Sequence, residues 1–308
     1  QGLTLSQEWK NVKPQIAKAD ASREFYTPSE RCYILETWRS VTDTMTFALA
    51  RVEPVVTLLL LLALAAAPAA SEVGEGVTIG IIIDDLGNNL ANGERAARLP
   101  GAVACAVLPH TPFARSVANA AHAAGKEVML HLPMASRDAQ EPGPGQLDAG
   151  MPALEMRATL DYDLSTVPHV IGVNNHMGSL LTTQPGAMDW LMRELAQRRL
   201  FFVDSRTDAE TVAANAARRV GVPVLERTVF LDDDLAPAAV ATQLDRLEHL
   251  ARRHGYALAI GHPHPVTLAA LERWLPQLAG RGIQLIPLTS RLARIAPEAK
   301  PWRASWSR

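Results

Sequence analysis

From residue 77 onward, short apolar segments with strand character alternate with amphipathic segments of helical period. This alternation is typical of α/β proteins, in which helices join parallel strands. The predicted strands are 77–85, 103–109, 127–133, 170–175, 200–204, 222–232, 256–261 and 283–288. The predicted helices are 93–99, 113–124, 153–167, 187–198, 209–220, 236–253 and 266–281. Seven or eight such units match a distorted (β/α) barrel of parallel strands, closed or incompletely closed.

The main alternative is a doubly wound open sheet, because periodicity alone does not show whether a sheet closes. No Gly-x-Gly-x-x-Gly or Walker-type loop follows the first predicted strand, which argues against a nucleotide-binding protein. Nucleic acid is not an expected partner either. The net charge of −2 gives no basic field, and at 5% of the 308 residues aromatic side chains are too scarce for a stacking surface.

Aspartates and histidines recur where the predicted strands end. These residues are Asp84, Asp85, His110, His131, His176, His262 and His264. In a barrel of parallel strands the carboxyl ends share one rim, so residues far apart in sequence converge there. Carboxylates and neutral imidazoles together form the ligand set of a divalent metal such as zinc. The sequence therefore predicts a metal site on this rim.

Asp84 and Asp85 are adjacent strand residues, so their side chains are expected to point in opposite directions and to do different jobs. One carboxylate would bind the metal, while the other would accept a proton from water. The alternative is a turn or cap pair, because aspartate is common after strands. His131 and His176 are the best histidine ligands, since each ends a strand and precedes small or turn-forming residues.

His262 and His264 flank a proline, and one of the two imidazoles would donate a proton to a leaving group. Either could instead bind the metal. His110 is a further rim residue that would contact substrate or support the site. Asp204 also ends a strand, where it would orient a catalytic group or pair with Arg206.

Two other segments bear on the rim. The acidic run 232–234 precedes a predicted helix, so we interpret it as helix capping. Residues 136–152 form a long polar loop directly after the strand that carries His131. This loop would either shape a substrate groove or be a mobile insertion.

The N-terminal part is predicted to lie outside the barrel. Residues 55–67 are the most apolar run of the chain, with the length of a signal-peptide core and small residues after it. We interpret 1–44 as a poorly ordered upstream extension, 45–70 as a signal peptide or N-terminal anchor, 71–298 as the barrel domain and 299–308 as a tail. Export to the periplasm is expected. Only an uncleaved segment would attach the protein to the membrane.

Taken together, the motifs resemble those of the divergent polysaccharide deacetylase family, remote relatives of the NodB-like carbohydrate esterases. The resemblance covers residues 77–295. The matching segments are 81–87, 108–113, 131–134, 174–179 (which includes Asn175), 202–207 and 261–264. It implies a NodB-like, distorted (β/α) barrel in an exported bacterial protein. It also implies metal-dependent removal of N- or O-acetyl groups.

By the same resemblance, Asp84 is the general base, Asp85 a metal ligand, and His262 or His264 the general acid. The chain departs from the NodB pattern at two places. The segment that matches the second NodB motif has one histidine, His131, where the NodB pattern has two. The arginine-centred third motif of the NodB pattern is absent from this chain. We therefore predict that His176, on another strand, replaces the missing metal ligand.

The sequence thus predicts a zinc-dependent hydrolase that deacetylates a cell-envelope glycan, such as an acetylated or peptidoglycan-like polysaccharide. Asp85, His131 and His176 would hold the zinc. Four further residues would contact substrate or support the site, namely His110, Asn175, Asp204 and Arg206. The alternative is a non-catalytic envelope protein that binds glycan or a protein partner through the same rim.

Overall fold

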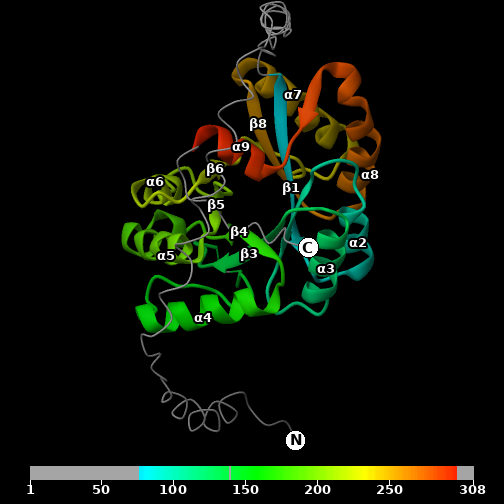
Figure 1. Ribbon diagram of the computed structural model, residues 1–308. Helices are drawn as coiled ribbons and strands as arrows, with labels where there is room; N and C mark the ends of the chain where they lie inside the picture. The colour runs from blue at the N-terminus through cyan, green and yellow to red at the C-terminus, as the bar shows by residue number, and fades with distance from the viewer. Residues whose placement is uncertain (1–75, 139, 297–308) are drawn as a thin grey trace, which may run out of the picture. The chain divides into compact units, whose positions relative to one another are not determined.

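The computed structural model describes residues 76–138 and 140–296 (Figure 1). The predicted upstream extension, export segment and C-terminal tail lie outside these residues and stay predictions. Within the described ranges, none of the helices combines the length and apolar character that crossing a membrane requires.

One parallel sheet forms the centre of the described part, and its neighbouring strands follow the order β6-β5-β4-β3-β2-β1-β8-β7. The strands are β1 (Val77–Leu86), β2 (Ala104–Val107), β3 (Val128–Met134), β4 (Val170–Met177), β5 (Phe201–Asp204), β6 (Val224–Glu226), β7 (Val229–Phe230), β8 (Tyr256–Gly261) and β9 (Ile283–Leu285). A doubly wound sheet reverses its strand order at a switch point. Here the order is that of an eight-stranded ring cut between β6 and β7, so the prediction of a distorted, incompletely closed barrel is confirmed.

Helices cover the outer face of the sheet. They are α2 (Leu90–Ala97), α3 (Ala114–Ala123), α4 (Ala153–Thr166), α5 (Pro185–Arg198), α6 (Ala213–Arg219), α7 (Pro237–His254) and α8 (Pro265–Trp274), with short 3₁₀ turns at Leu181–Thr183, Leu275–Gln277 and Ala279–Arg281; the last helix, α9 (Leu288–Ile295), does not lie on this face. Figure 1 shows α2, α3 and α8 together on one flank, and α5 and α6 on the other. The larger apolar core lies between these helices and the sheet.

A second, smaller core fills the inside of the half-barrel, where Met129 and Phe201 are fully buried. Helix α9 closes the end at which the strands begin, because its Leu288 and Leu292 belong to this inner core. Glu127 fixes α9 there, since its carboxylate accepts hydrogen bonds from the backbone N–H of Leu288 (2.7 Å) and of the following residue (3.0 Å). The opposite end, where the strands finish, remains available for a site.

The structure departs most from the predicted elements in three places. The predicted strand 222–232 is two strands, because Arg227 N donates to Asp204 O on β5 while Thr228 N donates to Leu258 O on β8. The chain therefore crosses the barrel seam at this point, with no helix between β6 and β7. The predicted helix 266–281 ends at Trp274, since Pro276 cannot donate the next helical hydrogen bond. Helix α9, which begins inside the predicted strand 283–288, was not predicted.

The polar loop 136–152 is attached to the sheet. Leu147 is fully buried and forms a parallel bridge with Met134 at the end of β3. Ala135 N donates to Leu147 O at 2.9 Å, and Leu147 N donates to Pro133 O at the same distance. These bonds hold the second half of the loop against the carboxyl end of β3.

Candidate metal centre

A bulge in β1 brings both aspartates to one place. The register of β1 against β2 shifts between Ile83 and Leu86, and Asp85 has a φ of 55°, in the left-handed region that few non-glycine residues adopt. As a result, Asp84 Oδ2 lies 3.6 Å and Asp85 Oδ1 lies 3.1 Å from His131 Nε2. The expectation that the two carboxylates point in opposite directions is therefore wrong, because it assumes a regular strand.

Three predicted metal ligands form a tight triangle. Asp85 Oδ1 lies 3.1 Å from His131 Nε2 and 2.9 Å from His176 Nδ1, and these two nitrogens are 3.1 Å apart. Donor atoms bound to one tetrahedral zinc at about 2.0–2.1 Å lie about 3.3 Å from each other, so the spacing fits a single ion. Asp85 Oδ1 is buried and makes no hydrogen bond within the described residues, as expected of a donor atom awaiting a cation.

The triangle contains a negatively charged side chain, which suits a cation, and one side of the triangle faces solvent. Burial alone would raise the pKa of Asp85, but the His131 and His176 rings outweigh burial and hold this pKa far below its usual range. Asp85 is therefore a carboxylate. The His131 side chain is only 3% exposed, whereas that of Asp85 is 34% and that of His176 19% exposed, so water or substrate can reach an ion from their side.

Asn174 links His131, a predicted metal ligand, to the second aspartate. Its Nδ2 donates to Asp84 Oδ1 at 2.8 Å and Oδ2 at 3.0 Å, while its Oδ1 lies 3.0 Å from His131 Nδ1. Because Nδ2 donates to both oxygens of Asp84, the amide oxygen of Asn174 is the atom that faces His131. His131 Nδ1 then carries the proton, which leaves the Nε2 lone pair free for a metal.

Asp84 itself is 2% exposed. Burial raises its pKa above the usual range, against the opposing effects of His131, His262 and the Asn174 hydrogen bond. A carboxylate with a raised pKa is a better proton acceptor at neutral pH than an exposed one.

His262 approaches the triangle from β8. Its Nε2 lies 3.9 Å from Asp85 Oδ2, and its Nδ1 donates to Asp232 Oδ1 at 2.9 Å. Asp232 Oδ2 also accepts from the backbone N–H of His262 (2.6 Å) and from Thr267 Oγ1 (2.7 Å). Burial alone would lower the pKa of His262, but Asp232, Asp84 and Asp85 outweigh it and raise the pKa to about 9. The ring is therefore a cation at pH 7 and can donate a proton from Nε2.

The interpretation of Asp232 as a helix cap is wrong. Helix α7 begins at Pro237, and Asp234 is the member of the acidic run whose carboxylate accepts a bond next to that start, from Ala236 N. Asp232 instead lies directly beyond the seam-crossing segment, where it holds His262. Asp232 directly follows the apolar residues 229–231, as Asp84 directly follows the apolar residues 81–83, and this pattern is the sequence signal that could have revealed it.

A second group of potential metal ligands consists of Asp232, His262 and His264. One donor atom of each of these residues lies within 4.8 Å of the donor atoms of the other two. Both oxygens of Asp232 are already hydrogen bonded. This group therefore fits the positioning of His262 better than it fits a metal ion.

The four predicted supporting residues are not part of the triangle. His110 Nε2 is 2.6 Å from Asp163 Oδ1 on α4, where burial lowers the pKa of His110 and raises that of Asp163 to about 8. Asn175 accepts from Ser205 N at 2.9 Å, which ties β4 to the segment after β5. Asp204 accepts from Arg206 N at 2.8 Å. The Arg206 side chain pairs with Glu226 at 2.8 Å.

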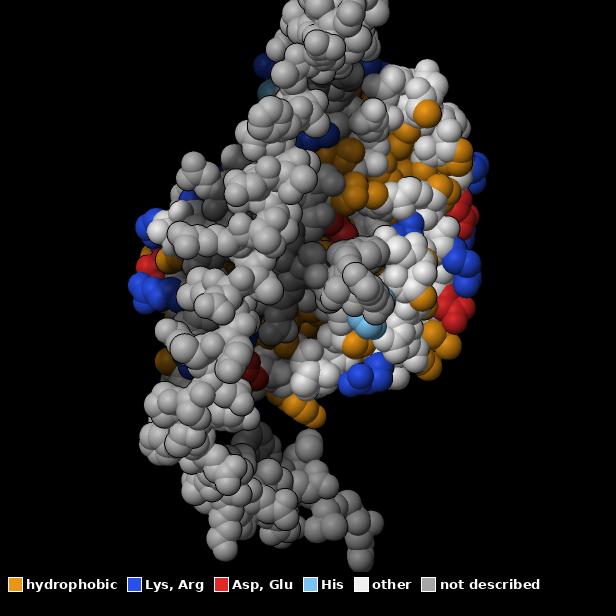
Figure 2. Space-filling model, viewed as in Figure 1, with side chains coloured by type: hydrophobic (Ala, Val, Ile, Leu, Met, Phe, Trp, Pro, Cys, Tyr) orange, Lys and Arg blue, Asp and Glu red, His pale blue; other side chains and the backbone are white. Residues whose placement is uncertain are grey.

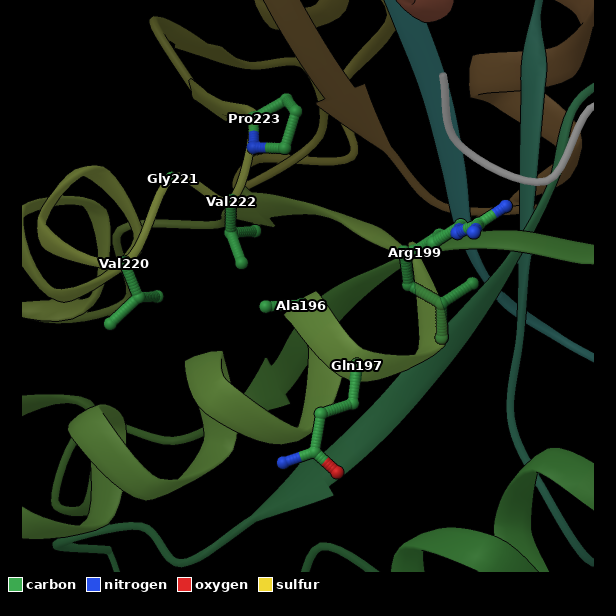
Figure 3. A pocket seen from close by; sticks show the side chains of 8 residues that line it. Ala196, Gln197, Arg199, Val220, Gly221, Val222 and Pro223 are labelled. Carbon is green, nitrogen blue, oxygen red and sulfur yellow. The ribbon is translucent and has the colours of Figure 1, made fainter. Parts of the chain in front are cut away.

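A separate cavity of about 440 Å³ lies at the opposite end of the sheet (Figure 3). It is lined by residues just before β5 and β6, including Leu200, Val222 and Pro223. Arg199 is the charged residue among those lining it, so the described cavity offers no group of metal-binding side chains.

Comparison with known proteins agrees with this geometry. A family model described as divergent polysaccharide deacetylase matches residues 81–292. An uncharacterized protein of Escherichia coli, YibQ, is 40% identical over 65% of this chain, and an uncharacterized protein of Haemophilus influenzae is 38% identical over 68%. The match spans 63% of the first relative's length and 74% of the second's.

The crystal structure of an uncharacterized protein from Agrobacterium tumefaciens has the same fold. It superposes with a TM-score of 0.68 and 26% sequence identity, over 70% of this chain and 89% of the other. The family match includes every residue of the triangle, as well as Asp84, Asn174, Asp232 and His262. This chain belongs to the divergent polysaccharide deacetylase family.

Proposed function

We propose that the protein is a zinc-dependent hydrolase that removes acetyl groups from a cell-envelope glycan. The observation that carries the proposal is the triangle of Asp85, His131 and His176, which has a buried carboxylate on one side and a cationic imidazole on another. Asp85, His131 and His176 would hold the ion. When bound, a divalent ion supplies Lewis-acid polarisation of the acyl carbonyl and of water.

The side chains of this protein would move the protons. Asp84 accepts a proton as a water oxygen bonds to the acyl carbon, and Asn174 holds the Asp84 carboxylate in place for this step. The bond from the acyl carbon to the sugar nitrogen or oxygen then breaks. His262 donates its Nε2 proton to that leaving atom, and acetate is the second product. Asp232 keeps the His262 ring oriented.

Two observations support a glycan of the cell envelope as substrate. The family description names polysaccharide deacetylases. The apolar run at 55–67, followed by small residues, supports export to the periplasm. Fractionation of cells that express the chain from Met45 would test this location. A full-length, membrane-bound product would instead indicate that the segment stays as an anchor.

Metal removal tests the proposal directly. Acetate release from an acetylated glycan, such as a chito-oligosaccharide or peptidoglycan strands, is expected to stop in excess chelator and to return when zinc is added back. Glycan binding that is unaffected by chelator, with no acetate released at any zinc concentration, would instead support the non-catalytic binding protein.

Variants of Asn174 separate its two contacts. Asn174→Leu removes the acceptor for His131 Nδ1, so zinc affinity is expected to fall about 10–100-fold, as for other residues that orient metal-bound histidines. Asn174→Asp keeps this acceptor but places a second carboxylate against Asp84. Zinc affinity is then expected to stay close to that of the wild type while kcat falls.

Zinc competition with a chromogenic chelator measures the affinity of these variants. Ser205→Ala, which removes a weaker contact of 3.4 Å to Asn174, is the control. Equal zinc affinity in Asn174→Leu and the wild type would contradict the role of Asn174.

A further inference from the structure

Arg227 lies at the barrel seam, between β6 and β7, on the same rim as the metal centre. Its side chain is fixed by main-chain oxygens, because Nε donates to Ser205 O at 2.5 Å and Nη2 donates to Arg206 O at 2.9 Å. In the described part of the chain these are the hydrogen-bond partners of the guanidinium, so Nη1 and the second N–H of Nη2 are left for a ligand. The group is therefore held in position before any ligand binds.

The charge of Arg227 has no carboxylate in direct contact within the described residues. The neighbouring Arg206, in contrast, pairs with Glu226 at 2.8 Å. Carbonyl oxygens orient a guanidinium but do not neutralise it, and a half-buried charge without a counter-ion costs free energy. Burial and Arg206 accordingly lower the pKa of Arg227, although Asp204, Asp84 and Asp233 act in the opposite direction. An anion bound at this point would offset the cost.

Arg227 also stands close to the proton donor. Its guanidinium carbon lies 5.0 Å above the centre of the Phe230 ring, and the Phe230 and His262 rings are 5.1 Å apart. One aromatic ring thus separates the guanidinium from His262. A substrate whose leaving atom faces His262 Nε2 would bring the groups beside that atom toward Arg227.

We propose that Arg227 forms an anion-binding subsite beside His262, and that the substrate is a glycan of acetylated amino sugars that carry a carboxylate. The planar fork of N–H groups suits a carboxylate, which it can bind through two parallel hydrogen bonds. A dianionic phosphate suits the place less well, because Asp84 and Asp233 already act on Arg227 from nearby. This inference rests on the proposed function only in taking the substrate to be a glycan.

A matched pair of substrates tests the subsite. Glycan strands of alternating N-acetylglucosamine and N-acetylmuramic acid are prepared with free lactyl carboxylates, and the same strands are converted to methyl esters. Both forms have the same acetyl groups and differ in charge. Their affinities for the full-length, zinc-loaded protein are measured by calorimetry, and acetate release is measured separately.

The wild type is expected to bind the acid form about 10-fold more tightly than the ester, as a charge-assisted arginine–carboxylate contact would give. In Arg227→Gln the ratio of the two affinities should fall to about one, and Arg227→Lys should retain part of it, since it keeps the charge but not the fork. Arg219→Gln is the matched control, because Arg219 on α6 pairs with Asp189 on α5 and should keep the wild-type ratio.

Each outcome separates this inference from the proposed function. A preference for the acid that depends on Arg227, with no acetate released from either form, would support the subsite and contradict the hydrolase. Equal binding of the two forms by the wild type would overturn the subsite, whether or not acetate is released. Failure of the wild type to bind either form would also overturn the subsite. An equal loss of both affinities in Arg227→Gln, with the ratio unchanged, would show that Arg227 merely clamps the segment after β5.

Discussion

Replacement of Asp84 by asparagine is expected to lower kcat for acetate release by about 10²–10⁴-fold, the range that a positioned general base contributes. The amide has nearly the same shape as the carboxylate but cannot accept a proton from water. Asp84 is not a corner of the ligand triangle, and its Oδ2 lies 3.6 Å from His131 Nε2. The variant is therefore expected to keep its zinc.

Two substrates show at which step Asp84 acts. A chito-oligosaccharide has a poor leaving group, an amine that needs a proton, whereas nitrophenyl acetate has a good one that does not. Attack by water is common to both, so Asp84→Asn should reduce both rates strongly. Zinc content and thermal unfolding of the variant are measured alongside. Wild-type turnover in an Asp84→Asn protein that keeps its zinc would contradict the assignment of the base.

Replacement of His262 by alanine should have an effect that depends on the leaving group. Since His262 is assigned the proton donor, kcat for the chito-oligosaccharide is expected to fall by about 10²–10⁴-fold. The rate on nitrophenyl acetate should change far less, because that leaving group departs without a proton. Rates on the two substrates, measured with the same zinc-loaded preparation, give the comparison.

Asp232→Asn and His264→Ala are the companions of this variant. Asparagine at 232 removes the charge that holds His262 Nδ1, so the Asp232→Asn protein should follow the His262→Ala pattern with a smaller loss. His264→Ala should follow neither, since its ring is 6.0 Å from that of His262 and has no part in the proposed proton transfer. If His262→Ala slowed both substrates equally, its role as the acid would fail. A selective loss in His264→Ala would transfer that role to His264.

The barrel and the place of the candidate metal centre were predictable from the sequence because they depend on local patterns. Apolar runs that end in Asp84–Asp85, His131 and His176 mark strands and polar strand ends, and a parallel barrel necessarily gathers such ends on one rim. The structure brings these residues together without any further assumption. The register of the strands was not needed to reach that result.

Asn174 and the shared direction of the two aspartates were not predictable, because they depend on register and on a bulge. Asn174 lies beside His131 in the pairing of β3 with β4, whereas its neighbour Asn175 pairs with Leu132. A shift of one residue exchanges the two faces of a strand. The sequence alone could therefore not decide which asparagine faces the site. Likewise, the bulge at Asp84–Asp85 arises from the pairing of β1 with β2.

Asp232 and Arg227 were missed for a different reason. Both belong to a segment whose pattern predicts one strand, although in the structure it leaves β5 and joins β8 within two residues. This crossing places Arg227 on the rim and Asp232 behind His262. Both positions depend on where the barrel opens, which no local period encodes.

Asp85, His131 and His176 are proposed to hold one metal ion, and the metal content of the full chain tests this most directly. The protein is purified without added metal or chelator and analysed for elements before and after titration with zinc. About one zinc per chain is expected, lost in His131→Ala and in His176→Ala and retained in the control His264→Ala. A wild-type chain that contains no ion and takes up none on titration, or an ion lost only in His264→Ala, would contradict the account.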